Sequence, residues 1–315
     1  MIPSSSYIPI GSTDILVSPL GIGTWSWGDK FMWGYGRDYS ENDIQAAFEI
    51  SFEAGINFFD TAESYGRGLS ETLLGRLINK NASPVIIATK YMPYPWRLSP
   101  GTLKSALKNS LKRLQIHKVD LYQIHWPLPP ISIETWVNAI ADCVDQEQVR
   151  AIGISNCNLS QMKRAISILV KRGMLLASNQ VEYNLLNRKI EFNGLLSACK
   201  DIGISLIAYS PLAQGLLSGK YTPDNPPSGI RGLRYTRIYL EKIQPLIRLL
   251  REIGRAHDGK TPSQVALNWL ISKGAIPIPG VKNMMQAIEI SSTVGWSITQ
   301  DELELLDIES GKVQS

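Results

Sequence analysis

Short apolar runs alternate with segments of helical length along most of this chain. Eight of the runs show little alternation between polar and apolar positions, which is typical of parallel strands that are buried on both faces. The predicted strands are residues 20–25, 57–62, 85–90, 119–125, 151–156, 177–183, 205–210 and 275–280.

Helix signals lie between these predicted strands. Ser99 can cap a helix that has Pro100 at its first position, and leucines then recur along one stripe as far as Leu114. Capping boxes at residues 261–264 and 299–302 predict two further helix starts, the second of them after the last strand.

Eight strand–helix units specify either a closed parallel barrel or a doubly wound open sheet. Residues 21–24 read Gly-Ile-Gly-Thr and lack the third glycine of a dinucleotide-binding fingerprint, so the barrel is favoured. Residues 8–10 and 15–17 predict a small hairpin that closes one end. We therefore predict an α/β protein with a single domain over residues 1–315: a (β/α)8 TIM barrel with an N-terminal β-hairpin and a C-terminal extra helix. Residues 222–232, rich in Pro and Gly, are predicted to form a long loop over the strand ends.

The chain of 315 residues carries a net charge of +4, and its Lys and Arg residues are scattered. This pattern favours a basic interior that receives phosphates and argues against a nucleic-acid partner. No apolar run approaches the roughly 20 residues that span a bilayer, and the N-terminus resembles neither a signal nor a transit peptide. We expect a cytoplasmic protein, or one of the plastid stroma if a transit peptide was removed, and a monomer in preference to an oligomer.

The three cysteines, Cys143, Cys157 and Cys199, form no Cys-x-x-Cys pair and no cluster with histidine. Such an odd, sparse set indicates reduced thiols rather than disulfides or a zinc site, and we predict no bound metal. Cys157 is expected to be an inert small apolar side chain.

Four polar residues fall at or just beyond the C-terminal ends of neighbouring predicted strands, where barrel enzymes keep their active sites. Asp60 ends strand two, Tyr65 lies in the loop that follows, Lys90 ends strand three and His125 ends strand four. Alone, most of them have an ordinary structural explanation, such as a turn carboxylate or a packed histidine. A lysine at the end of a buried strand is harder to explain in that way, because it must reach solvent or a carboxylate.

Together these four residues suit the reduction of a carbonyl group. A phenol is mostly protonated at pH 7 and can donate a proton, and a neighbouring ammonium lowers its pKa. We assign Tyr65 as the proton donor, Lys90 as the group that tunes it and Asp60 as the anchor of Lys90. His125 would orient the substrate oxygen.

Several stretches of the chain form longer motifs. Residues 59–66 read Phe-Asp-Thr-Ala-Glu-Ser-Tyr-Gly, and residues 119–127 read Val-Asp-Leu-Tyr-Gln-Ile-His-Trp-Pro. Further motifs lie at residues 70–75, 110–114, 152–156, 180–184, 208–212, 278–282 and 286–289. The set closely resembles the aldo-keto reductase signature and spans nearly the whole chain. The resemblance implies a barrel that binds NAD(P)H extended across the strand ends, without a Rossmann fold.

The resemblance also implies roles for individual residues. The catalytic tetrad would be Asp60, Tyr65, Lys90 and His125. The nicotinamide would be held by Ser155, Asn156 and Gln180 at its carboxamide and by stacking on Tyr209. The loop over the pyrophosphate would contain Ser210, Leu212, Gln214, Gly215, Lys220 and Arg231. The adenosine-phosphate end would contain Gly280, Lys282, Gln286 and Glu289, and the other cofactor contacts would be Gly23, Thr24, Trp25 and Asp60.

The segment after strand eight indicates a phosphate site on physical grounds as well. A helix predicted from about Asn283 would present its N-terminal amides and dipole to an anion. Lys282 can neutralise a 2′-phosphate, and no acidic residue stands beside it to hold a free 2′-hydroxyl instead. We therefore expect NADPH and NADP+ in preference to NADH; the alternative is that Lys282 is an ordinary solvated lysine. Ile290 stands where the family usually has Asn, so we expect one adenine contact to be missing.

Five tryptophans lie in segments that end near the predicted strand tips: Trp25, Trp27, Trp33, Trp96 and Trp126. Trp25 and Trp126 directly adjoin strand ends and are the best candidates for an apolar wall around a substrate. Core packing is the alternative for each indole. The predicted substrate pocket consists of Trp25, Tyr65, His125 and Trp126.

We predict an NADPH-dependent oxidoreductase that reduces an aldehyde or ketone, a small-molecule carbonyl substrate, to the alcohol, with Tyr65 as general acid. The same site run in reverse would oxidise an alcohol with NADP+. An alternative from another class is an NAD(P)H-binding, redox-sensing regulatory subunit resembling the potassium-channel β subunits, although the chain has no long N-terminal inactivating segment. Within the family, the sequence resembles bacterial and plastid members that include pyridoxal reductases.

Overall fold

The barrel strands run in sequence order around one sheet. The computed structural model describes residues 2–81, 84–227, 232 and 235–314. Each strand of the eight-stranded sheet pairs in parallel with the next one along the chain. The strands are β3 (Ile22–Gly23), β4 (Phe58–Asp60), β5 (Ile86–Tyr91), β6 (Val119–Ile124), β7 (Val149–Ser155), β8 (Leu176–Glu182), β9 (Ser205–Tyr209) and β10 (Ala275–Pro277). A parallel bridge between Gly23 and Gly280 joins the two ends of the sheet, so it closes as the predicted barrel.

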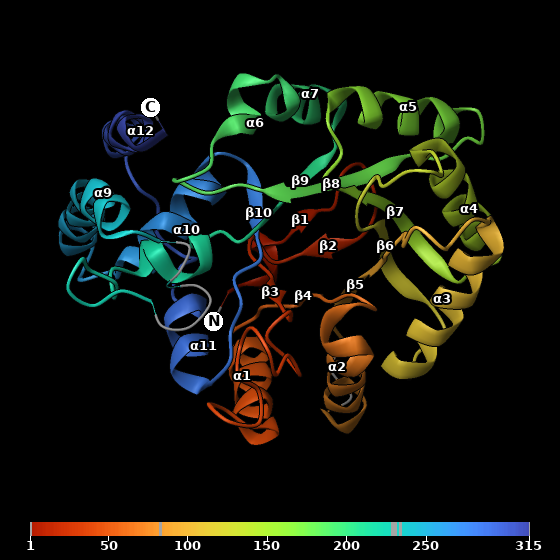
Figure 1. The fold of residues 1–315 in the computed structure, drawn as a ribbon, viewed down its shortest axis with the longest axis horizontal. Helices are drawn as coiled ribbons and strands as arrows, with labels where there is room; N and C mark the ends of the chain where they lie inside the picture. Colours follow the sequence, from red (N-terminus) through yellow and green to blue (C-terminus); the bar gives the residue numbers. More distant parts are fainter. Residues whose placement is uncertain (1, 82–83, 228–231, 233–234, 315) are drawn as a thin grey trace.

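Helices surround the strands, as Figure 1 shows. Between successive strands or after the last one lie α1 (Glu41–Glu53), α2 (Leu69–Asn81), α3 (Pro100–Leu114), α4 (Ile133–Asp145), α5 (Leu159–Val170), α6 (Lys189–Phe192), α7 (Leu195–Ile202), α9 (Arg237–Ala256), α10 (Pro262–Ser272), α11 (Met284–Ser291) and α12 (Gln300–Gln314). Helix α9 packs on α10, and α12, the predicted C-terminal extra helix, packs on α9. Within the described residues, no helix has the length and apolar character needed to cross a membrane.

The predicted hairpin, formed by β1 (Ile8–Pro9) and β2 (Leu16–Val17), covers the N-terminal ends of the barrel strands. The Gly11 N–H donates to the Ser205 hydroxyl at the start of β9, and the Ser18 N–H donates to the Asn57 side chain just before β4; both distances are 2.7 Å. Apolar hairpin and strand side chains then fill the barrel interior, among them Ile10, Ile15, Val17, Phe58, Leu121, Ile207 and Ile276. The opposite, C-terminal ends of the strands are therefore the face on which a cavity can form.

Local helix signals are confirmed with one difference. The capping boxes at residues 261–264 and 299–302 are both formed. Ser99 takes the N-cap position before Pro100, but its side chain makes no cap hydrogen bond. The Thr102 hydroxyl instead donates to the Ser99 carbonyl oxygen (2.6 Å), so Pro100 and the apolar stripe define this helix start without the predicted serine cap.

The first and last barrel strands are shorter than predicted. After Gly23 the chain turns, with the Trp27 N–H bonded to the Thr24 carbonyl oxygen (2.9 Å), and after Pro277 a second proline at 279 has no N–H for the ladder. The apolar runs continue past both strands because Trp25, Ile278 and Pro279 line the cavity above them. The predicted loop at residues 222–232 is described as far as residue 227 and at residue 232.

Candidate active site

Lys90 is the centre of a buried polar cluster at the C-terminal ends of β4 and β5. Its side chain is fully buried and is ion-paired with Asp60, the last residue of β4. Its Nζ also donates to the Thr61 carbonyl oxygen (2.8 Å) and to the Tyr65 hydroxyl oxygen (3.2 Å). These three acceptors match the three donors of an ammonium group, which lets the charge be buried. Because an ammonium only donates, the Tyr65 oxygen is the acceptor in this bond and keeps its own proton to donate elsewhere.

Burial and the neighbouring charges shift the pKa values of Tyr65 and Lys90. Burial raises the pKa of Tyr65 above its ordinary value, Lys90 lowers it and Asp60 adds to the rise. For Lys90, burial lowers the pKa, but Asp60 and Tyr65 outweigh this and the pKa is raised. The lowering of the Tyr65 pKa by Lys90, expected from the sequence, is therefore present, but the net direction is upward. At neutral pH the cluster holds a protonated phenol beside a charged ammonium.

His125 directly follows β6 and meets Tyr65 edge to face, with ring centroids 5.7 Å apart. Burial, with a smaller effect of Lys90, lowers the pKa of His125 to about 3, so its imidazole is neutral near pH 7. The Ser64 hydroxyl lies 3.4 Å from Nδ1. A hydroxyl that donates to Nδ1 leaves the ring hydrogen on Nε2, which suits His125 as a hydrogen-bond donor to a substrate oxygen.

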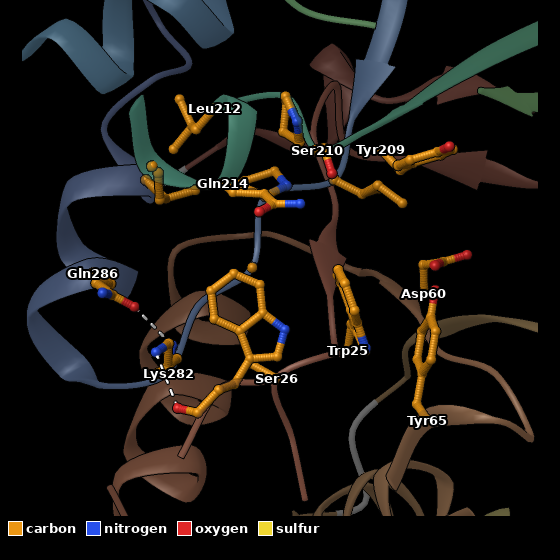
Figure 2. A pocket seen from close by; sticks show the side chains of 18 of the residues that line it. Trp25, Ser26, Asp60, Tyr65, Tyr209, Ser210, Leu212, Gln214, Lys282 and Gln286 are labelled. Atoms are coloured by element: carbon orange, nitrogen blue, oxygen red, sulfur yellow. Dashed lines mark hydrogen bonds between the residues drawn. The ribbon is translucent and has the colours of Figure 1, made fainter. Parts of the chain in front are cut away.

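A cavity of about 660 Å³ opens above this cluster. Figure 2 shows Asp60 and Tyr65 on one side of it and Lys282 and Gln286 on the other. Between them, the end of β9 and the chain that follows it run along the cavity, as the labelled side chains show: Tyr209, Ser210, Leu212 and Gln214. The cavity therefore connects the Tyr65 cluster to the start of α11.

The segment after β9 has an unusual backbone. Ser210, Ala213 and Gln214 have φ values of 49°, 48° and 55°, and Gly215 has a φ of 95°. Non-glycine residues with positive φ are uncommon, and they concentrate at sites that bind ligands. Ala213 and Gln214 begin η3 (Ala213–Ser218), a short 3-10 segment. Backbone of this kind can turn successive N–H groups toward an anion.

Lys282 occupies the far end of the cavity, just before α11. Its Nζ lies 5.0 Å from the ring centre of Trp33 and 4.9 Å from that of Tyr39. The predicted helix start is confirmed, since Asn283 is the N-cap and its side chain accepts from the Gln286 N–H (3.0 Å). The charge of Lys282 also contributes to lowering the pKa of Asp38 in the loop before α1, although the main partner of Asp38 is Arg37.

Most predicted site residues line this one cavity. They are Gly23, Trp25, Asp60, Tyr65, His125, Trp126, Ser155, Asn156, Gln180, Tyr209, Ser210, Leu212, Gln214, Gly215, Lys220, Gly280, Lys282, Gln286 and Glu289. Lys90 is not a lining residue, but its Nζ donates to the hydroxyl oxygen of Tyr65, which lines the cavity. Thr24 does not line it: its buried hydroxyl bonds to the Asp60 carbonyl oxygen and to Ser70, because the chain turns after Gly23. Arg231 lies outside the described residues.

The tryptophans divide between cavity, core and surface. Trp25 and Trp126 line the cavity as expected, and Trp33 joins them with its ring 5.5 Å from that of Trp25. Trp27 is buried and donates to the Val281 carbonyl oxygen (2.8 Å), which is a core role. Trp96 is exposed and stacks on Tyr94 away from the cavity lining.

Several residues that line the cavity were not predicted from the sequence. They are Ser26, Ser64, Pro211, Ser218, Ser263, Ile278 and Pro279, and Trp33 was included only among the general tryptophan candidates. Ser64 and Pro211 adjoin predicted residues, so adjacency is a signal that could have identified them. Ser263 lies at the start of α10, and only the packing of that helix brings it to the cavity.

Comparisons with known proteins agree with this architecture. The sequence profile of the Aldo/keto reductase family matches residues 19–309. The chloroplastic pyridoxal reductase of Arabidopsis thaliana is 40% identical over 300 residues, which is 91% of this chain and 81% of that protein. A crystal structure of a thermostable aldo-keto reductase in complex with the inhibitor epalrestat is 31% identical, with a TM-score of 0.79, and the match covers 96% of this chain and 99% of that one. An aldo-keto reductase from Klebsiella pneumoniae in complex with NADPH is 25% identical, with a TM-score of 0.73 and coverage of 95% and 93%. This chain therefore belongs to the aldo/keto reductase family.

Proposed function

We propose that this chain uses NADPH to reduce an aldehyde or ketone to the alcohol, with Tyr65 as general acid. The observation that carries the proposal is the buried Lys90 ammonium, 3.2 Å from the Tyr65 oxygen and ion-paired with Asp60. Burial keeps the phenol protonated, and Lys90 places a cation where a phenolate would form. A neutral His125 faces the same end of the cavity.

The lining of the cavity fits NADPH. Near Tyr65, the side-chain amides of Asn156 and Gln180 suit a carboxamide, and the Tyr209 ring offers a surface for the nicotinamide. The left-handed backbone after β9 suits the pyrophosphate. Lys282 and the N-terminal end of α11 suit a 2′-phosphate.

Each residue of the cluster has one part in the reduction. NADPH, when bound, supplies the hydride that the carbonyl carbon accepts. Tyr65 donates its proton to the carbonyl oxygen as negative charge develops there. Lys90 stabilises the resulting phenolate, and Asp60 keeps Lys90 charged and in place. The neutral His125 donates a second hydrogen bond to the carbonyl oxygen and fixes its direction.

The walls near Tyr65 favour an aromatic or otherwise planar aldehyde. Trp25 lies with its ring 6.3 Å from that of Tyr65, and Trp126 lines the cavity beside His125. Flat indole faces suit a flat substrate. The Arabidopsis relative is a pyridoxal reductase, which supports pyridoxal as the first aldehyde to test.

The test is NADPH consumption by the purified protein with pyridoxal, 4-nitrobenzaldehyde and methylglyoxal, with product alcohol identified by mass spectrometry. Saturable turnover with at least one aldehyde is the expected result. Tight NADPH binding with no turnover on any carbonyl would overturn the proposal and favour a regulatory subunit that senses the cofactor.

A further inference from the structure

Gln123 is a fully buried glutamine of β6 whose side chain joins two residues of the candidate site. Its Nε2 donates to Asp60 Oδ2 (3.1 Å), and its Oε1 accepts from Gln180 Nε2 (3.3 Å). Gln180 Nε2 also donates to Asp60 Oδ2 (2.9 Å). The three side chains, from β4, β6 and β8, thus form a closed set of hydrogen bonds. Asp60 and Gln180 line the cavity, whereas Gln123 is not among its lining residues.

This network determines which way the Gln180 amide faces. The Asp60 carboxylate is paired with Lys90 and can only accept, so both glutamines must turn their NH2 groups toward it. The Gln123 oxygen then faces the second N–H of Gln180. Both donors of Gln180 are used in this way, and its Oε1 receives no hydrogen bond from any described residue. That oxygen remains as the acceptor that Gln180 can offer to a ligand in the cavity.

Gly153 makes the network possible. It lies on β7 directly opposite Gln123, between the strands that carry Gln123 and Gln180. A Cβ atom at this position would lie 2.7 Å from Gln123 Cγ and 2.6 Å from Ser178 Oγ. Such distances are well inside normal contact, so a side chain at position 153 would displace Gln123 from its path across β7.

We propose that Gln123 is a positioning residue for the cofactor: it fixes the Gln180 amide so that its oxygen accepts a hydrogen bond from the nicotinamide carboxamide NH2. Gly153 leaves the space through which it does so. The inference rests on the proposed function, because it requires that the nicotinamide lies beside Gln180. Without Gln123, the Gln180 amide loses one partner and can rotate, and a rotated amide would offer N–H groups to the carboxamide donor.

The test measures binding to the protein without substrate, by quenching of tryptophan fluorescence. Gln123→Met keeps a linear side chain of similar length and removes the amide. The probes are NADP+, its 3-acetylpyridine analogue, in which a methyl group replaces the carboxamide NH2, and adenosine 2′,5′-bisphosphate, which has no nicotinamide. Tyr122→Phe is the matched control, since its neighbouring hydroxyl on β6 is buried and has no hydrogen-bond partner among the described residues.

Gln123→Met is expected to weaken NADP+ binding about tenfold, as for the loss of one hydrogen bond, and to change binding of the other two probes by less than about twofold. Tyr122→Phe should leave all three unchanged. Gly153→Ala retains Gln123 but displaces it. This variant is expected to show the same selective loss of NADP+ binding, and it replaces Gln123→Met if that variant does not fold.

Equal weakening of NADP+ binding and of acetylpyridine-analogue binding would overturn the inference, because it would show a general structural role for Gln123. Unchanged NADP+ binding would also overturn it. Failure of the wild-type protein to bind both NADP+ and the bisphosphate would instead overturn the proposed function itself.

Discussion

At the scale of single residues, the site depends on how Tyr65 is held in its protonated form beside a cation. Burial and Asp60 raise the pKa of its phenol, and Lys90 opposes them. The result is a phenol that does not ionise at neutral pH but has an ammonium 3.2 Å from its oxygen when the proton leaves. Each of these groups can be removed separately.

Tyr65→Phe removes only the hydroxyl. We expect kcat for carbonyl reduction to fall by at least ~100-fold, the lower range for a positioned general acid, while NADPH affinity stays near wild type. Steady-state kinetics and a fluorescence titration measure the two quantities. Near wild-type turnover in a folded variant would transfer the proton-donor role to His125 or to water.

Lys90→Met removes the ammonium and keeps most of the packing. In the proposed mechanism, alcohol oxidation uses Tyr65 as a phenolate base. Because Lys90 lowers the pKa of Tyr65, loss of Lys90 should raise the pH at which this base forms. We expect the alkaline rise in the rate of alcohol oxidation with NADP+ to shift upward by more than about one pH unit. Melting curves recorded beside the pH profile separate lost tuning from lost folding, because the variant leaves Asp60 without its cation. An unshifted profile with normal turnover would contradict the proposed role.

Lys282→Ala tests the cofactor preference. Loss of this cation should weaken NADPH binding by more than about tenfold and leave NADH nearly unchanged, because only NADPH carries the 2′-phosphate. Lys220→Ala is the comparison, since Lys220 lines the cavity near the left-handed segment and should affect both cofactors alike. Titration of both proteins with both cofactors gives the four affinities. If Lys282→Ala weakened the two cofactors equally, Lys282 would have to act on the shared pyrophosphate or on the loop.

At the scale of helices and strands, the cavity lies between rigid elements joined by polar contacts. Asp307 of α12 accepts from Trp269 Nε1 (2.9 Å) in α10 and pairs with Lys273 and Arg188. The Ser310 hydroxyl of α12 donates to the Leu185 carbonyl oxygen in the loop after β8. Asn184 in the same loop donates to the Ser210 carbonyl oxygen (3.0 Å), at the start of the left-handed segment. Helix α12 is thereby linked to the cavity through two short loops.

Asp307→Ala tests how much the contacts of α12 contribute to the free energy of unfolding. The change leaves the Trp269 N–H and the Lys273 ammonium without their Asp307 partner, while Arg188 keeps Glu191. We expect the free energy of unfolding to fall by about 2–3 kcal/mol, as for partly buried donors that lose an acceptor. Glu309→Ala, on the same helix in a more exposed pair with Lys312, should cost less than about 1 kcal/mol. Urea unfolding of both variants gives the comparison, and equal costs would show that Asp307 acts only as a surface charge.

For the molecule as a whole, the parallel ring from β3 to β10 has two different ends, and the hairpin closes one of them. The single domain over residues 1–315 remains a prediction. The closed end is filled with apolar side chains, whereas the open end holds titratable groups such as Tyr65 and His125. The stability of the protein should therefore depend on pH, because the fold holds these groups in one protonation state. His125 is the clearest case, with its pKa lowered to about 3.

Between about pH 3 and 6.5, His125 is neutral in the folded protein and protonated in the unfolded chain. The unfolded state then binds more protons, so stability falls as the pH falls below 6.5. From pH 7 to pH 5 this one group should lower the free energy of unfolding by up to about 2 kcal/mol. Urea unfolding of the wild type and of His125→Gln at both pH values isolates the contribution. If the free energy of unfolding changed equally between pH 7 and pH 5 in the two proteins, groups other than His125 would be the cause.

Local sequence patterns were enough to predict the eight strands, the hairpin, two capping boxes and the positions of Asp60, Tyr65, Lys90 and His125 at or just beyond strand ends. These features depend on local periodicity and on the rule that parallel strands in a barrel end on one face. Most of the predicted cofactor residues line one cavity, because they adjoin those strand ends.

Which side chains turn into the cavity, and which groups they contact there, depends on the packing of distant segments. Thr24 faces Ser70, whereas Trp33 and Ser263 reach the cavity from a loop and a helix. The charge of Lys282 contributes to lowering the pKa of Asp38, although the two residues are 244 positions apart in sequence. The net direction of the Tyr65 pKa also required the structure, because burial and two opposite charges act on it at once. Side-chain direction, burial and long-range charge depend on how the barrel closes, and no local pattern in the sequence contains that information.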